Sequence, residues 1–183
     1  MAAVLDQRKV WTREDIARLS ELFPNERLEL IEGDLIEKMG QKPLHAYVVA
    51  LLTQLLMTAF PERVRSQTSI NINDPKSEPE PDVVVLHSSI REFFDSHPSP
   101  IDIALVIEVA DTSLAMDREV KYRLYARAGI AEYWIVDLVN RRTIVCRRPD
   151  GEEYRSVIIY DGREEFSLNE SFRCSTAELL PDK

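Results

Sequence analysis

Two carboxylates stand beside the most apolar stretches of the chain and are candidates for chemistry. Asp82 directly precedes the apolar run Val83–Leu86, and Glu108 lies near the end of the apolar segment Ile101–Val109. Ionising an acid within an apolar strand is costly unless a partner compensates its charge. If the two segments form neighbouring strands, their carboxylates converge on one point. The simplest partner for such a pair is a hard divalent cation, because these ions take oxygen ligands.

Each carboxylate also has an ordinary structural explanation. Asp82 could cap a loop, and Glu108 could form an ion pair with an arginine side chain. Both acids, however, stand beside runs that are rich in β-branched residues. This shared setting favours a joint site over two separate structural roles.

One lysine is spaced to serve the same site. Asp117, Lys121 and Tyr125 recur at every fourth position after Glu108, so they share one face of a predicted helix. Lys121 either forms an exposed ion pair with Asp117 or directs its ammonium group at the carboxylate pair. In the second arrangement it would orient or deprotonate a water molecule and stabilise a pentavalent phosphate. That arrangement predicts Lys121 in the same cavity as Asp82 and Glu108.

Other catalytic chemistries find little support in the sequence. His45, His87 and His97 form neither an H-E-x-x-H motif nor a cluster, and there is no G-x-S-x-G or phosphate-binding glycine loop. Cys146 and Cys174 form no C-x-x-C motif, so we interpret them as semi-buried apolar residues. His45, which opens a predicted helix, has either a polar surface role or a catalytic one.

The composition limits the class of protein. The chain has 183 residues, with 32 acidic and 23 basic side chains and a net charge of −9, which argues against coating nucleic acid by bulk charge. It leaves room for a nucleic-acid enzyme, because metal-bound carboxylates attract anions. The length predicts a single domain, residues 1–183. The longest apolar stretch, Ala46–Phe60, is too short to span a bilayer, and no signal peptide is evident, so we expect a cytoplasmic protein without membrane association.

Apolar periodicity predicts a mixed α/β arrangement. Helices are expected at residues 12–22, from 43 to the proline at 61, and at 114–128, with one helical turn at 90–94. Strands are expected as a hairpin around residues 32–34 and at residues 63–73, 82–86, 101–109, 132–138, 141–147 and 154–160, with one more strand and a terminal turn after 164. This order predicts one mixed sheet with helices on both faces.

Four segments resemble a known family. Pro81, Asp82, Glu108 and a lysine are similar to the PD-(D/E)XK pattern of nucleases with a restriction-endonuclease-like fold. The stretches RLELIEGDLIEKM, the helix at His45, EPDVVVL and IEVADTSLAMDREVKYRLYARAGIAEYWIVDL resemble more closely the Uma-two family of endonucleases. The resemblance covers roughly residues 12–160 and implies a restriction-endonuclease-like core, a central mixed sheet flanked by helices.

The resemblance also implies roles for residues. Asp82 and Glu108 would bind the metal, which is Mg²⁺ or alternatively Mn²⁺. The superfamily pattern places a lysine two residues after the glutamate, where this chain has Ala110, and the resemblance maps that lysine to the following helix. Glu29, in ELIEG, matches a glutamate that completes such sites.

The resemblance therefore implies a Mg²⁺-dependent endonuclease that hydrolyses DNA phosphodiester bonds. Lys121 would be its catalytic lysine, and His45 matches a family histidine. The alternative is a catalytically inactive module on the same fold that binds nucleic acid or another protein. A homodimer is expected, because cutting both strands suits two symmetric sites and the family implies the same. The polar segment 88–100 is a candidate interface or DNA contact.

Overall fold

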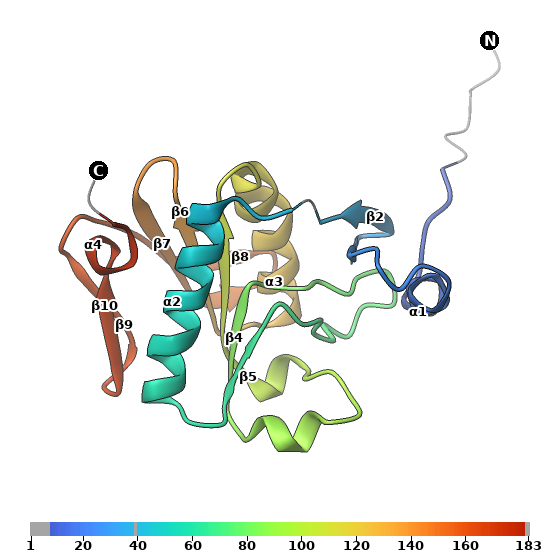
Figure 1. The fold of residues 1–183 in the computed structure, drawn as a ribbon, viewed down its shortest axis with the longest axis horizontal. Coiled ribbons are helices and arrows are strands. Elements are labelled where there is room, and N and C mark those ends of the chain that lie inside the picture. Colours follow the sequence, from blue (N-terminus) through green and yellow to red (C-terminus); the bar gives the residue numbers. More distant parts are fainter. Residues whose placement is uncertain (1–7, 39, 182–183) are drawn as a thin grey trace, which may run out of the picture.

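The computed structural model describes residues 8–38 and 40–181, and its centre is a six-stranded mixed sheet (Figure 1). The strands, in their order across the sheet, are β3 (Val64–Ser66), β4 (Val83–Leu86), β5 (Ile103–Ala110), β6 (Glu132–Asp137), β7 (Arg142–Asp150) and β8 (Glu153–Asp161). Strands β5 and β6 are parallel, whereas the other neighbours in this sheet are antiparallel. The mixed α/β architecture predicted from the sequence is confirmed.

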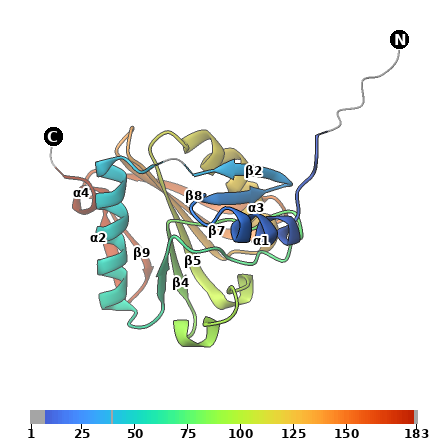
Figure 2. The same ribbon diagram turned by 45° about the vertical axis from the view of Figure 1, so that its right-hand side comes forward.

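Helices cover both faces of this sheet (Figures 1 and 2). They are α2 (Pro43–Ala59) on one face and α3 (Tyr122–Ala128) on the other. Side chains of a strand point alternately to its two faces, and β4 shows the result. Val83 and Val85 pack in the same core as Leu52 of α2, whereas Val84 packs in the core that contains Leu124 of α3. The sheet is therefore buried on both sides, which explains the continuous apolar run in β4.

An N-terminal helix and hairpin lie side by side next to the central sheet (Figure 2). They are α1 (Arg13–Leu22), β1 (Leu28–Ile31) and β2 (Asp34–Glu37). Thr12 and Asp15 form a reciprocal capping box that starts α1, within the helix predicted at residues 12–22. Leu30 of the hairpin is fully buried and forms an isolated bridge with Glu78, in the loop before β4. The hairpin is thus fixed against the segment that leads to Asp82.

The hairpin turn gives a prediction about stability. Gly33 has φ of +90°, and a Cβ atom there would lie 2.6 Å from Cγ1 of Val10. Because both the backbone conformation and the crowding oppose a side chain, Gly33→Ala should lower the free energy of unfolding by about 1–3 kcal/mol. Gly40→Ala is the matched control, since a Cβ there meets nothing within 4 Å. Urea denaturation measures both variants, and equal midpoints would contradict the expectation.

The strand predicted at residues 63–73 is wrong beyond Ser66. Gln67 has φ of +51°, which ends the extended conformation. Ile70 and Ile72 are nevertheless buried, in the core on the α3 side of the sheet. The N–H of Ile70 donates to the carbonyl of Pro79 rather than to a neighbouring strand. Alternating burial therefore persists here in a loop, and alternation alone does not distinguish this loop from a strand.

The C-terminal part holds two strands where one was predicted. They are β9 (Glu165–Asn169) and β10 (Phe172–Ser175), followed by α4 (Thr176–Leu179). The two strands pair as a separate antiparallel hairpin. Phe166 and Phe172 pack against Trp134 of the central sheet, with ring centroids 5.0 and 6.2 Å apart from it. This aromatic contact extends the core on the α2 side.

Short helical turns complete the described chain. The segment 88–100 contains the 3₁₀ turn η1 (Ile90–Phe93), as predicted, and a second turn, η2 (Pro100–Asp102), delays the start of β5 to Ile103. The helix predicted at residues 114–128 ends at Gly129 with φ of +80°, as expected for a glycine cap. Within residues 8–38 and 40–181, every helix is too short or too polar to cross a membrane.

Candidate active site

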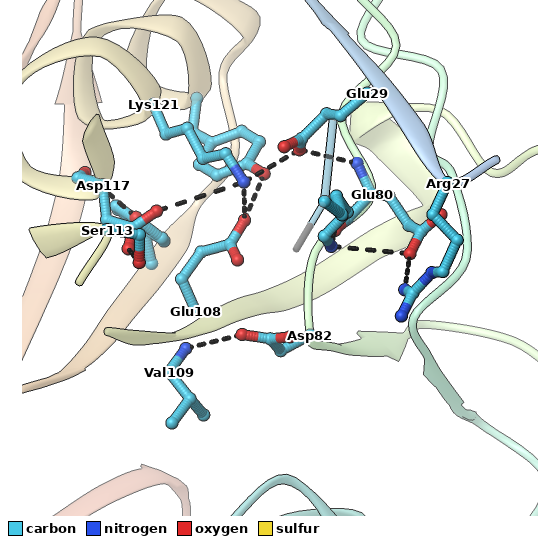
Figure 3. A network of polar contacts seen from close by, with 12 residues as sticks. Arg27, Glu29, Glu80, Asp82, Glu108, Val109, Ser113, Asp117 and Lys121 are labelled. Carbon is cyan, nitrogen blue, oxygen red and sulfur yellow. Dashed lines mark hydrogen bonds and ion pairs between the residues drawn. The ribbon is translucent and has the colours of Figure 1, made fainter. Parts of the chain in front are cut away.

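The pairing of β4 with β5 brings the two candidate carboxylates together. Val83 stands opposite Ile107 in the antiparallel register, so Asp82 and Glu108 are adjacent at the same end of the two strands. Both side chains are buried. Oδ2 of Asp82 accepts a hydrogen bond of 2.8 Å from the N–H of Val109, which fixes it against β5 (Figure 3).

Lys121 reaches this pair from a separate element. Its Nζ lies 2.9 Å from Oε1 of Glu108 and 2.8 Å from Oε1 of Glu29, which comes from β1 (Figure 3). Oδ1 of Asp117 is 4.0 Å away. Lys121 thus has the i, i+4 partner that the sequence offers it, but the pair is buried. Glu29, Asp82, Glu108 and Lys121 all line one cleft of about 420 Å³.

A π-helical turn holds the lysine in place. Residues Met116–Lys121 (η3) wind as a π-helix, and the N–H of Tyr122 donates to the carbonyl of Asp117, five residues earlier. The side chain of Asp117 is held by the Ser113 hydroxyl at 2.6 Å, and its carbonyl also accepts from the hydroxyl of Tyr133 at 3.0 Å. Such turns are uncommon and recur at functional sites. Here the turn buries Asp117 and Lys121 together.

Tyr125 supports Glu108 from below the cleft. Its buried hydroxyl donates to Oε1 of Glu108 at 2.9 Å, the same oxygen that faces Lys121. Among the described residues no hydrogen-bond donor reaches Oε2 of Glu108. The carboxylate is therefore held through one oxygen and can offer the other to a ligand.

Removing the Tyr125 hydroxyl tests this support. Tyr125→Phe deletes one hydrogen bond to a buried carboxyl group, so the free energy of unfolding should fall by about 1–3 kcal/mol. Tyr47→Phe is the matched control, because Tyr47 is exposed and should change stability by less than about 0.5 kcal/mol. Chemical denaturation followed by fluorescence gives both values. A Tyr125→Phe variant as stable as the native chain would show that the hydroxyl does not support Glu108.

His45 lies beside Asp82. It sits in the first turn of α2, which starts at Pro43. Nε2 of His45 is 3.2 Å from Oδ2 of Asp82, and its other ring nitrogen, Nδ1, is buried without a hydrogen-bond partner among the described residues. The structure thus brings together all five residues singled out from the sequence, with His45 beside Asp82 and Glu29 beside Lys121.

A family model described as "Uma2: Putative restriction endonuclease" matches residues 13–179. The chain belongs to the Uma2 family. This is the Uma-two family that the sequence resembles, and the expectation is confirmed. The comparison with curated proteins found no match.

A solved structure resembles this Uma2 protein over almost its whole length. It is the crystal structure of "a putative nuclease belonging to DUF820 from Anabaena variabilis", with 18% sequence identity and a TM-score of 0.71. The similarity covers 92% of this chain and 97% of that chain. At this identity it shows a shared restriction-endonuclease-like fold. The family model and the solved protein are both described as "putative" nucleases.

The two carboxylates of the Uma2 site differ in their affinity for protons. Burial raises the pKa of Glu108 to about 8. The charge of Lys121 lowers this pKa, and the nearby charges of Asp117, Asp82 and Glu29 raise it. Burial would also raise the pKa of Asp82, but the hydrogen bond and charge of His45 and the N–H of Val109 lower it overall.

Lys121 keeps its positive charge in this setting. Burial alone would lower the pKa of Lys121, but the charges of Glu108, Glu29 and Asp117 outweigh it and raise the pKa. The protonated ammonium is a hydrogen-bond donor with no free electron pair. In this arrangement Lys121 therefore supplies positive charge to the cleft.

The oxygen donors of the cleft fit a hard divalent cation. Asp82 and Glu108 supply carboxylate oxygens at the cleft wall. The described residues contain no group of three or more His, Cys, Asp and Glu side chains that could hold a metal ion by itself. Mg²⁺ does not require one, because it commonly binds one or two carboxylates and completes its shell with water and substrate phosphate. The residues thus suit a cation that binds together with substrate.

Three further cationic side chains among the described residues line the cleft; they were not predicted from the sequence, and we call them the cationic rim. Arg27, Lys38 and Lys42 line the cleft along with Lys121. Nζ of Lys38 donates to the carbonyl of Glu80 at 2.6 Å, and Lys42 pairs with Asp111 at 2.8 Å. Arg27 directly precedes β1, Lys38 directly follows β2, and Lys42 directly precedes α2. Their clustering depends on how the hairpin docks, so no local pattern in the sequence reveals it.

Proposed function

We propose that this Uma2 protein is an endonuclease that hydrolyses DNA phosphodiester bonds with Mg²⁺ bound at Asp82 and Glu108, and that Mn²⁺ can replace Mg²⁺. The observation that carries the proposal is the Lys121 ammonium group at 2.9 Å from Glu108, in a cleft that Asp82 also lines. A paired carboxylate set with a fixed cationic donor suits a reaction in which a phosphate gains negative charge.

The residues of the chain would divide the work as follows. Asp82 and Glu108 hold the metal, and the bound cation would polarise a phosphoryl oxygen and assist the leaving oxygen. Lys121 orients the attacking water and stabilises the charge that develops on the phosphate. Glu29 accepts a 2.9 Å hydrogen bond from the N–H of Glu80 and holds Lys121 from the other side.

The rim supports nucleic acid as the substrate class. Lys38 and Lys42 supply positive charge at the mouth of the cleft, in a chain whose net charge is −9. Lysine is a common partner of phosphate oxygens. Lys42 is the more exposed of the two and, among the described residues, pairs only with Asp111, so it is the cation that a DNA backbone could recruit, whereas Lys38 is held by Glu80.

Cleavage of plasmid DNA tests the proposal directly. Supercoiled plasmid is incubated with the protein and Mg²⁺ or Mn²⁺, with and without EDTA. We expect nicking or linearisation that requires the metal and is lost in Asp82→Ala. Glu170→Ala, at an exposed turn between β9 and β10, is the control and should cut like the native chain. Inactivity with both metals on double-stranded DNA, single-stranded DNA and RNA would contradict the proposal and favour a non-catalytic binding module.

A further inference from the structure

One edge of the central sheet is apolar and exposed. Strand β8 is last in the sheet order: it pairs with β7, and among the described residues no strand pairs with its other side. Val157, Ile158 and Ile159 in its middle are 48%, 44% and 47% exposed. An edge strand presents unpaired N–H and C=O groups to any second strand, and proteins usually blunt such edges. This edge has no proline or lysine between Glu153 and Asp161.

The two ends of β8 are held by other elements of the same chain. The N–H of Tyr154 donates to the hydroxyl of Tyr122 at 3.0 Å, and the carbonyl of Tyr160 accepts from the hydroxyl of Thr176 at 3.1 Å. These contacts keep the strand extended while its apolar middle stays open. The strand is thus already extended, which lowers the ordering cost of pairing. A partner strand that reaches Tyr160 shares its carbonyl with the Thr176 hydroxyl or displaces it.

The sequence of β8 complements itself around Ile158. When two copies run antiparallel with Ile158 opposite Ile158, Val157 stands opposite Ile159, and Arg155 stands opposite Asp161. The two-fold axis repeats each contact, so two arginine–aspartate pairs flank an apolar centre. Opposite charges and β-branched pairs across antiparallel strands are both stabilising.

Arg155 is able to make the new pair. Within its own chain it contacts Asp150 at 2.9 Å, but both side chains are more than half exposed. Surface pairs of this kind contribute little. Turning the guanidinium group from Asp150 toward Asp161 of a second copy therefore loses little energy.

We propose that β8 is the contact surface for a second copy of this chain. The two β8 strands then pair antiparallel, and the two six-stranded sheets join edge to edge into one continuous sheet. The contact is isologous and uses up the free edge, so it yields a closed dimer and no filament. This inference concerns assembly and does not depend on the proposed nuclease activity.

Light scattering on the full chain gives the first test. Over a range of protein concentrations, the native chain should show the mass of two copies. Ile158→Lys places two ammonium groups face to face, and should raise the dimer dissociation constant on the order of 100-fold. Ile101→Lys is the matched control, because Ile101 is 84% exposed and lies outside β8, and it should remain dimeric. A native chain that is monomeric throughout, or an Ile158→Lys variant that dimerises like the control, overturns the proposal.

Cysteine cross-linking tests the register without a disruptive charge. Opposed residues of antiparallel strands have Cα atoms about 4.5–5.5 Å apart, within disulfide range. Ile158→Cys should therefore form a disulfide-linked dimer under mild oxidation. Ser156→Cys should not, because in this register Ser156 faces Tyr160 of the second copy. The native Cys146 and Cys174 are buried and do not interfere. Equal cross-linking of the two variants would refute the register.

Charge reversal provides a third measurement. Arg155→Glu alone and Asp161→Arg alone each create two repulsive contacts, so each should weaken dimerisation by about tenfold. The double variant restores opposite charges and should recover most of the native affinity. If the double variant lost as much dimerisation affinity as the two single changes together, these residues would not meet across the interface.

Discussion

Replacing Lys121 by alanine should reduce DNA cleavage by about 10²–10³-fold and leave the affinity for Mg²⁺ within a few-fold of the native value. The ammonium group lies 2.9 Å from Glu108 and is directed into the cleft, where it would face the charge that develops on the phosphate. A lysine ammonium has no lone pair and cannot be a metal ligand. Activity and metal binding should therefore separate in this variant.

Stability needs control in that experiment. Removing one member of a buried charge pair can cost about 3–5 kcal/mol, because Glu29 and Glu108 lose their shared partner. Lys121→Met keeps the aliphatic volume and serves as the second variant. Rates are compared at a temperature where circular dichroism shows each variant folded. Lys42→Met, on the rim, should weaken DNA binding mainly and spare the maximal rate. If Lys121→Ala lost metal binding while Asp82→Ala retained it, the assigned roles would be reversed.

Addition of Mg²⁺ should raise the melting temperature by about 5–10 °C when its concentration is a hundredfold above the dissociation constant. A ligand that binds only the folded state then adds about 2.7 kcal/mol, and a domain of this size gains about 2–4 °C per kcal/mol. The binding energy should come from Asp82 and Glu108, which are adjacent and buried. Asp82→Ala and Glu108→Ala should each flatten the response.

Screening of surface charge is the competing explanation of such a shift. The chain has 32 acidic residues against 23 basic ones, so any salt reduces repulsion among them. NaCl at matched ionic strength is the control and should give a much smaller shift. An equal rise of the melting temperature with NaCl, or an undiminished rise with Mg²⁺ in both variants, would show that the metal does not bind at Asp82 and Glu108.

The central part of the site could be predicted because its buried strands are visible in the sequence as apolar runs. Asp82 and Glu108 each stand beside such a run, which predicts a buried strand. The helical spacing of Asp117, Lys121 and Tyr125 allowed Lys121 either an exposed ion pair or a place in the cleft, and the family resemblance favoured the cleft. Glu29 and His45 depended on the family resemblance, since nothing in their own segments points toward the cleft.

The features that escaped prediction depend on contacts between distant segments. A π-helical turn differs from an α-helical one by a single hydrogen-bond partner, so residues 116–121 look like ordinary helix in sequence. The alternation of Ile70 and Ile72 is satisfied by a buried loop instead of a strand. The second C-terminal strand is short, and its place is decided by packing of Phe172 on Trp134.

The N-terminal hairpin also determines when the site forms during folding. Glu29 lies in β1, and its partner Lys121 follows it by more than half the length of the chain. The exposed pair of Arg127 and Glu32 spans 95 positions. Contacts this far apart close large loops and delay folding. The central sheet can pair through more local contacts before the hairpin docks. A chain with a complete sheet would still lack one wall of its cleft, so we expect the site to be completed only when the hairpin docks.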